Sequence, residues 1–297
     1  MTTTQARAEI PTPRAPGVRR VARRFRRNKL AVAALAVLLL MIVVAAAAPW
    51  IAPFEPLQID VANRLSGPSA KHWLGTDTLG RDTLSRLMYA GRVSIGAAAL
   101  AVAIAVAVGV PLGMLAGYLG GWFDWLLNRA ADVLMTFPAL VLTIAIIAAT
   151  GPGLITAMVA LGVVYSPRLF RIVRGSTLGV RQETYIEASI SIGTPSGMML
   201  RRHILPNILS PVLVQVSLLM AAALLSEVTI SLLGLGVLPP TASWGSMLGA
   251  AFGDIRRTPM LVAYPGFAIA LVTLSFNLIG DGLRDSFGRE TRTGEGS

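Results

Sequence analysis

Side chains that could carry acid–base or metal chemistry are few in this sequence of 297 residues. The chain has no cysteine, and its two histidines, His72 and His203, lie far apart. A thiolate site is therefore excluded and a histidine-based metal centre is disfavoured. His72, Asp77 and Asp82 could form an acid–base group, but nothing in the sequence places them together. The sequence therefore assigns no catalytic residue and no metal ligand.

Glu227 is the one acidic residue deep within a long apolar run. A charge at the centre of a bilayer costs at least about 2.5–3.5 kcal/mol on insertion scales. We therefore expect Glu227 to face the bundle interior, a partner subunit or water, or to be neutral. Two roles fit this position: a place in a translocation pathway, and a structural hydrogen bond near the outer end of the helix.

The sequence lacks the usual motifs for binding ATP, for relaying protons and for hydrolysis. The chain has no Gly-x-x-x-x-Gly-Lys-Ser/Thr loop to hold ATP, no His-Glu-x-x-His and no Gly-x-Ser-x-Gly. It also lacks a chain of intramembrane acids of the kind that relays protons. If this protein moves a solute uphill, the energy enters from another subunit, and a polar cytoplasmic loop is the natural docking site.

The longest such polar stretch runs from Glu183 to Asn207, between two apolar segments. Helical spacing places Glu183 and Glu187 on one face of a first short helix. Four other residues share a second face: Tyr185, Ala188, Ser189 and Ile192. An ordinary surface loop between two membrane helices is the alternative interpretation.

Gly193 is expected to end this first helix, because glycine adopts the left-handed conformation at little cost. Thr194 and Pro195 then resemble an N-cap and a first-turn proline, which predicts a second short helix towards Pro206.

The composition indicates a polytopic membrane protein. The chain is 54% hydrophobic and only 14% charged, and several apolar runs reach membrane-spanning length. The formal charge of +11 could suggest a nucleic-acid partner. The arginines, however, flank the expected cytoplasmic ends of helices, as the positive-inside rule predicts, so we expect a lipid bilayer and no nucleic acid.

Six spans with both termini in the cytoplasm satisfy the arginine distribution. They are Leu30–Ala48, Val93–Gly117, Val133–Ala149, Leu154–Phe170, Ile208–Leu233 and Met260–Ile279. The first is longer than a signal-peptide core, which favours a span over a cleaved signal. The predicted layout is a basic, mostly disordered tail (1–29), a first helix (30–50), an outer segment (51–91), a five-helix core (92–281) and a short tail (282–297). Within the core lie a cytoplasmic loop (175–207) and an outer loop (234–259).

The segments around the spans carry further expectations. Asp82 and Arg86 are spaced to form an ion pair on a helix that leads into the membrane. Residues 117–132 are predicted to form a turn and an amphipathic interfacial helix. Gly109 in the second span should allow close helix contact. Residues 232–247 should dip back towards the bilayer while packed on protein.

Several motifs together resemble binding-protein-dependent ABC importer permeases, over residues 20–287. The central one is Glu187-Ala188-Ser189, then Gly193, then His203-Ile204-Leu205-Pro206, in which Ser189 and His203 depart from the usual alanine and isoleucine. The others run over 74–86, 117–124, 227–236, 239–245 and 280–285. The nearest resemblance is to the C-type permease subunit of the dipeptide, oligopeptide and nickel branch.

This resemblance implies an all-α type I importer permease of six transmembrane helices in the bacterial plasma membrane. It implies a homologous B-type permease, two ABC ATPase subunits that bind ATP and magnesium, and an extracytoplasmic binding protein that delivers peptide. The chain itself would bind no cofactor and catalyse no reaction. Coupling to the ATPases is assigned to Tyr185, Glu187, Ala188, Ser189, Gly193, His203, Leu205 and Pro206.

The same resemblance places Asp77, Arg81, Asp82 and Trp244 on the outer side, near the gate or the binding protein. Nickel or another small solute is the alternative cargo. A secondary transporter or channel that works without ATP, and a membrane hydrolase that uses Asp77, Asp82 or Glu227, are the alternatives from other classes.

Overall fold

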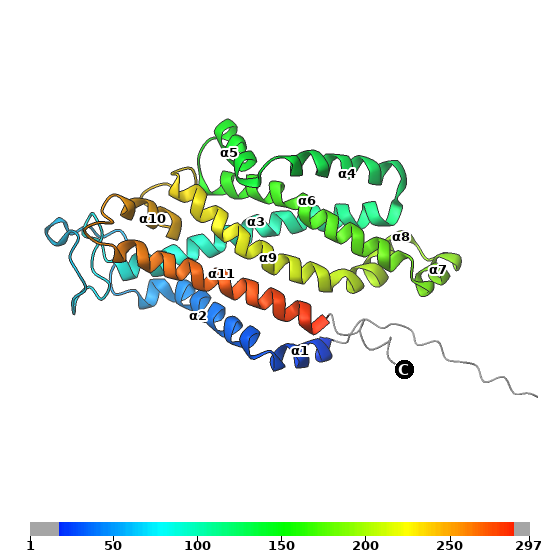
Figure 1. The fold of residues 1–297 in the computed structure, drawn as a ribbon, viewed down its shortest axis with the longest axis horizontal. Helices are drawn as coiled ribbons and strands as arrows, with labels where there is room; N and C mark the ends of the chain where they lie inside the picture. The colour runs from blue at the N-terminus through cyan, green and yellow to red at the C-terminus, as the bar shows by residue number, and fades with distance from the viewer. Residues whose placement is uncertain (1–17, 288–297) are drawn as a thin grey trace, which may run out of the picture.

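The computed structural model describes residues 18–287, which fold into an elongated bundle of helices in which no β-strand is present (Figure 1). The helices are α1 (Val18–Arg27), α2 (Lys29–Ile51), α3 (Thr83–Leu119), α4 (Gly121–Thr136), α5 (Ala139–Thr150), α6 (Leu154–Arg181), α7 (Thr184–Ser191), α8 (Ser196–Met198), α9 (Leu205–Leu232), α10 (Trp244–Phe252) and α11 (Met260–Phe287). A π-helical segment (Met199–Ile204) joins α8 to α9, and residues 61–63 form a 3-10 turn. The all-α fold class is confirmed.

Within residues 18–287, five helices are long and apolar enough to span a membrane: α2, α3, α6, the α8–α9 unit and α11. The pair α4 and α5, bent by 91°, passes the same test when the two are counted together, which gives up to six spans. The predicted span over 133–149 is divided between these two helices. Phe137 is extended because Pro138 disfavours the helical conformation of the residue before it, so the helix ends at Thr136.

The other spans extend beyond their predicted ends. α3 begins at Thr83, ten residues before the predicted start, and α6 continues to Arg181. α11 reaches Phe287, so the predicted C-terminal tail is helical over 282–287. The predicted disordered N-terminal tail contains α1 over Val18–Arg27, and its first seventeen residues lie outside the described part of the chain.

Close packing of α3 on α6 forms the centre of the bundle. A Cβ atom at Gly109, Gly113 or Gly117 would lie 2.7–2.8 Å from a backbone carbonyl oxygen of α6. Gly162 on α6 approaches the carbonyl of Ala101 equally closely, at 2.7 Å. The expectation of small-residue contact at Gly109 is therefore confirmed. The register of these contacts shows that α3 and α6 run in the same direction.

The amphipathic α4 lies along α6 and is fixed there by ion pairs. Arg174 holds Asp124 with two nitrogens, one of them Nη2 at 2.6 Å from Oδ2, and Arg171 pairs with Asp132. These contacts confirm a separate helix in the region predicted to be amphipathic, although it extends to Thr136.

The two ends of the bundle carry different segments (Figure 1). Residues 52–82 and α10 lie at one end, here called the outer end. α7 and α8 lie at the opposite end, here called the α7 end, and α1 and the end of α11 are on that side too.

Candidate functional site

At the α7 end, the short helix α7 is fixed to the bundle by two residues. The side chain of Ile186 is fully buried. The hydroxyl of Tyr185 accepts a hydrogen bond from Asn207 Nδ2 at 3.0 Å, and the same amide donates to the His203 carbonyl at 2.6 Å. Partial burial raises the pKa of the Tyr185 phenol, and the Glu183 carboxylate adds to the rise. α7 is therefore tied to the start of α9.

The turn after α7 uses the two polar residues that flank it. Gly193 has φ +80, and its N–H donates to the Ile190 carbonyl at 2.9 Å. The Thr194 N–H donates to the Ser189 carbonyl at 3.2 Å, and the two hydroxyls lie 3.0 Å apart. The predicted glycine turn is confirmed, and Ser189 contributes a contact that alanine could not make.

The outward surface of this turn carries two exposed isoleucines beside the polar residues Glu187 and Ser191. We define the α7 knob as residues 187–193. Within it Glu187, Ala188 and Gly193 are exposed, and the side chains of Ile190 and Ile192 are 44% and 84% exposed. The predicted common face is divided, because Tyr185 and Ser189 are half-buried while Ala188 and Ile192 point to solvent. A tethered helix thus presents aliphatic side chains outward.

The predicted second helix differs from the expectation in two ways. Thr194 is not an N-cap. The helix begins at Ser196, so Pro195 occupies the N-cap position. The helix also does not stop near Pro206. It passes through the π-helical segment, which contains the half-buried His203, and continues as α9 from Leu205, with Pro206 in its first turn. Because π-helical turns precede it directly, Pro206 lies within a continuous helical path, where its missing N–H removes one backbone hydrogen bond.

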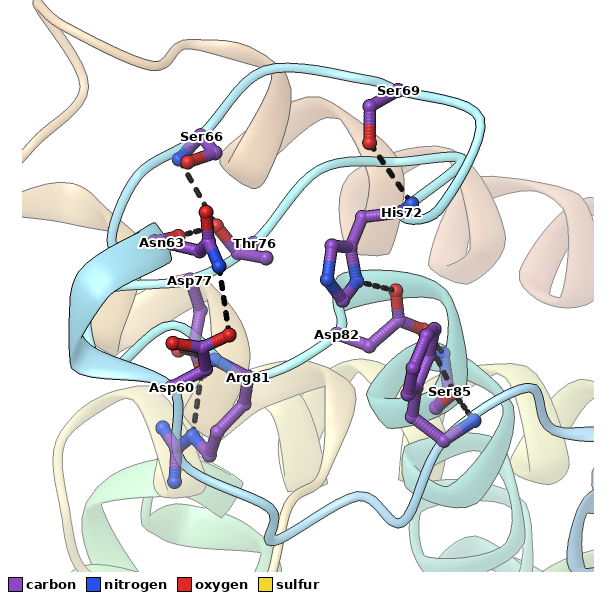
Figure 2. Close-up of polar contacts among 11 residues, drawn as sticks. Asp60, Asn63, Ser66, Ser69, His72, Thr76, Asp77, Arg81, Asp82 and Ser85 are labelled. Carbon is purple, nitrogen blue, oxygen red and sulfur yellow. Dashed lines mark hydrogen bonds and ion pairs between the residues drawn. The ribbon is translucent and has the colours of Figure 1, made fainter.

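At the outer end, the carboxylate of Asp82 is buried, and both of its oxygens have polar partners (Figure 2). It caps α3 through the Ser85 N–H at 2.8 Å, accepts the Ser85 hydroxyl at 2.7 Å and lies 2.9 Å from His72 Nδ1. The predicted Asp82–Arg86 ion pair is wrong, since capping directs Asp82 away from that face. Arg86 instead pairs with Asp77, with 3.3 Å between Nε and Oδ2.

Asp77 organises the neighbouring turn. It accepts the backbone N–H groups of Leu79 and Arg81 at 2.8 and 3.0 Å and pairs with Arg81 Nε at 2.7 Å (Figure 2). Structure thus brings together His72 and Asp82, which sequence alone could not, but places Asp77 with two arginines. Among the described residues, no three histidine, aspartate or glutamate side chains gather as metal ligands.

Trp244 closes the outer end from α10. Its side chain is 1% exposed, its N–H donates to Ser94 Oγ at 3.0 Å, and its indole Nε1–H donates to the Leu87 carbonyl at 3.1 Å. The ring lies over Gly91, where a Cβ atom would come within 3.0 Å of it. The outer loop is therefore packed on protein at this point, as predicted.

Glu227 is fully buried in the bundle next to α10. Ser231 donates to its Oε1 at 2.8 Å, and Ser94 and Ser243 lie near the same carboxyl group. Its Oε2 has no hydrogen-bond partner among the described residues. Of the orientations left open by the sequence, the structure selects the bundle interior.

Sequence reasoning missed Ile186 and Asn207, the two residues that hold α7. Asn207 directly follows the His203–Pro206 motif, so its position was a usable signal. Nothing in the sequence distinguishes Ile186 from its exposed neighbours Ile190 and Ile192.

Comparisons with known proteins agree with this arrangement. Residues 109–293 match the family described as binding-protein-dependent transport system inner membrane component. Residues 18–68 match the N-terminal TM domain of oligopeptide transport permease C.

Two curated relatives extend over most of the chain. The glutathione transport system permease protein GsiD of Shigella flexneri is 43% identical over 265 residues, covering 89% of this chain and 88% of the relative. The dipeptide transport system permease protein DppC of Alkalihalophilus pseudofirmus is 40% identical over 264 residues, covering 89% and 87%.

A chain of the MetNI methionine ABC transporter, solved in inward-facing conformations, has a similar fold. The TM-score is 0.53 at 17% identity, and the match covers 65% of this chain and 93% of that one. The protein described here therefore belongs to the binding-protein-dependent ABC importer permeases, in the C-type group of the oligopeptide branch, and is a multi-pass protein of the bacterial inner membrane.

Proposed function

We propose that this chain is one of two permease subunits of an ATP-driven importer of dipeptides or oligopeptides. The two named relatives support this cargo, since one transports dipeptides and the other the peptide glutathione. The chain would pair with a homologous B-type permease, receive peptide from an extracytoplasmic binding protein and rest on two ATPase subunits. It would catalyse no reaction itself and bind no cofactor, because ATP and Mg²⁺ would be held by the ATPase subunits.

The α7 knob is the observation that carries this proposal. Ile190 and Ile192 are exposed on a helix anchored by Ile186 and Asn207. This arrangement is suited to bind a groove with apolar lining on a partner. Movement of the ATPase subunits would reach α9 through the Tyr185–Asn207 contact. Nucleotide on the ATPase subunits can shift the complex between its two states only by binding one state more tightly than the other. The contact between α7 and α9 must therefore differ between those states.

This assignment orients the chain in the membrane. The α7 knob, α1 and the end of α11 would face the cytoplasm, and residues 52–82 with α10 would face outward. Asp77, Arg81, Asp82 and Trp244 would then support the surface to which the binding protein docks, and Glu227 would lie beneath it.

Gly193→Asp tests the proposal. A Cβ atom added at Gly193 would meet no atom within 4 Å inside the chain, but the aspartate would have to adopt φ +80 and would place a charge on the docking surface. We expect the purified complex to retain its partner chains and basal ATPase activity but to lose stimulation by peptide-loaded binding protein. Peptide uptake in proteoliposomes would fall with it.

Gly151→Asp is the matched control, since Gly151 also has positive φ (+96) and open space around it but lies in the turn between α5 and α6. It should leave coupling intact. Wild-type uptake by Gly193→Asp would refute the role of the α7 knob. Uptake by the purified chain alone, without ATPase subunits, would favour a secondary transporter instead.

A further inference from the structure

An apolar groove runs along the side of the bundle at the α7 end, between α1, α2, α9 and α11. It has a volume of about 660 Å³. Its lining is mostly apolar and includes Phe25, Leu35, Leu209, Leu213, Ile279 and Leu283, while Asn207, Ser210 and Arg26 are its polar residues. We propose that this groove binds one anionic phospholipid, with an acyl chain along α9 and α11 and the phosphate at Arg26 on α1.

Helix α1 supplies the charged rim of the groove. Phe25 turns into the groove, while Arg23, Arg26 and Arg27 are exposed. Arg26 is the only charged residue among the described residues that line the groove, and α1 contains no acid. An amphipathic helix with this pattern lies at a membrane surface, where its arginines meet lipid headgroups.

Contacts with α11 fix α1 in this position. Arg24 Nη1 donates to the Ser286 carbonyl at 3.4 Å. Phe25 packs against Gly282, where an added Cβ atom would lie 3.2 Å from the aromatic ring. The groove therefore has a defined wall on the α1 side.

The chemistry of the groove selects a lipid with a negative headgroup. The side chains of Leu209 and Leu213, on the membrane-spanning α9, are each 44% exposed beside it and offer an aliphatic surface that matches an acyl chain. An acyl chain covers that surface, and a guanidinium binds phosphate oxygens through several N–H groups at once. The absence of acids from α1 disfavours a cationic or peptide occupant that would need a carboxylate partner.

Lipid titration of the intact complex tests the proposal. The full chain, purified with its partner subunits in detergent and stripped of lipid, is titrated with palmitoyl-oleoyl phosphatidylglycerol or phosphatidylcholine and examined by native mass spectrometry. We expect tighter binding of phosphatidylglycerol. One surface arginine contributes about 1 kcal/mol of attraction, so Arg26→Gln should weaken phosphatidylglycerol binding about five-fold.

Leu213→Trp should fill the groove and lower the binding of both lipids. Two matched variants should change nothing: Arg23→Gln on the same helix, and Leu225→Trp, an exposed site on α9 that does not line the groove. Equal affinity for the two lipids, or an unchanged Arg26→Gln variant, would overturn the proposal.

The partner permease is the competing occupant. Because the chain has no cysteine, Leu213→Cys carries a unique thiol for a photoactivatable cross-linker. We expect cross-links to lipid, and cross-linking to the partner permease would overturn the proposal. Placement in the inner leaflet rests on the orientation proposed above. The binding assay does not depend on that orientation. A reversed topology would leave lipid binding intact, whereas an empty groove would show none.

Discussion

The two ends of this helical bundle differ in which side chains they bury and which they expose. At the outer end charged groups turn inward: the buried Asp82 carboxylate lies against His72 Nδ1 and accepts the Ser85 hydroxyl (Figure 2), although His72 Nε2 has no partner among the described residues. Trp244 is buried against Gly91 at the same end. At the α7 end the aliphatic residues Ile190 and Ile192 turn outward. The outer end thus holds its charged network within the chain, although Ile59 and Trp73 are exposed there, while the α7 end presents its two exposed isoleucines on a helix tied to α9.

Trp244→Ala should give the largest loss of stability, because the outer end depends on it for packing. Removing a buried tryptophan costs about 3–5 kcal/mol, and this one also donates to the Leu87 carbonyl. Thermal unfolding of the detergent-solubilised protein should show a large fall in Tm. Trp73→Ala, at a 66% exposed tryptophan of the same end, is the control. Equal shifts for both variants would contradict the described packing.

Asp82→Ala should have the next largest effect. It leaves His72 Nδ1 and the Ser85 hydroxyl buried without their partner and removes the cap of α3, at a cost of about 1–3 kcal/mol. Glu55→Ala, at an exposed acidic residue of the same segment, should change the free energy of unfolding by less than about 0.5 kcal/mol. The same thermal measurement compares the two, and a harmless Asp82→Ala would show that the outer end is not held by this carboxylate.

Tyr185→Phe should have a smaller and more local effect. It removes the acceptor for Asn207 and should destabilise α7 by about 0.5–1.5 kcal/mol. Hydrogen exchange of residues 184–193 should accelerate, while α3 and α6 should be unaffected. In a double-mutant cycle with Asn207→Ala, the two effects should be less than additive, because both remove the same contact. Full additivity would mean that the Tyr185 and Asn207 side chains do not stabilise each other.

Local chemistry explains which features could be predicted from the sequence. Spans, the glycine turn at Gly193 and the packing at Gly109 follow from residue type alone, since each depends on apolarity, backbone freedom or size. The break at Phe137–Pro138 was also readable, because proline restricts its predecessor. The apolar run over 133–149 hides this break, because apolarity alone does not distinguish one helix from two.

Features that depend on competition between partners could not be predicted. Asp82 is four residues from Arg86, but capping and His72 take its oxygens, and helical spacing carries no information about either. Ile186, Asn207 and the groove at Arg26 arise from contacts between helices distant in sequence. Their positions are fixed only when the bundle has packed.

Ile192→Ser should have the smallest effect on stability and a large one on coupling. Its side chain is 84% exposed, so the free energy of unfolding should change by less than about 0.5 kcal/mol. Burying an isoleucine in a partner groove is worth about 1.5–3 kcal/mol, so the affinity of the permease for its ATPase subunits should fall about ten-fold or more.

Ile59→Ser, at a 57% exposed isoleucine of the outer end, should also leave stability unchanged and should keep ATPase affinity. Titration of the ATPase subunits onto each permease variant in nanodiscs separates these cases. Equal losses of affinity at both sites would remove the distinction between the two ends, since an exposed isoleucine would then mark no docking surface.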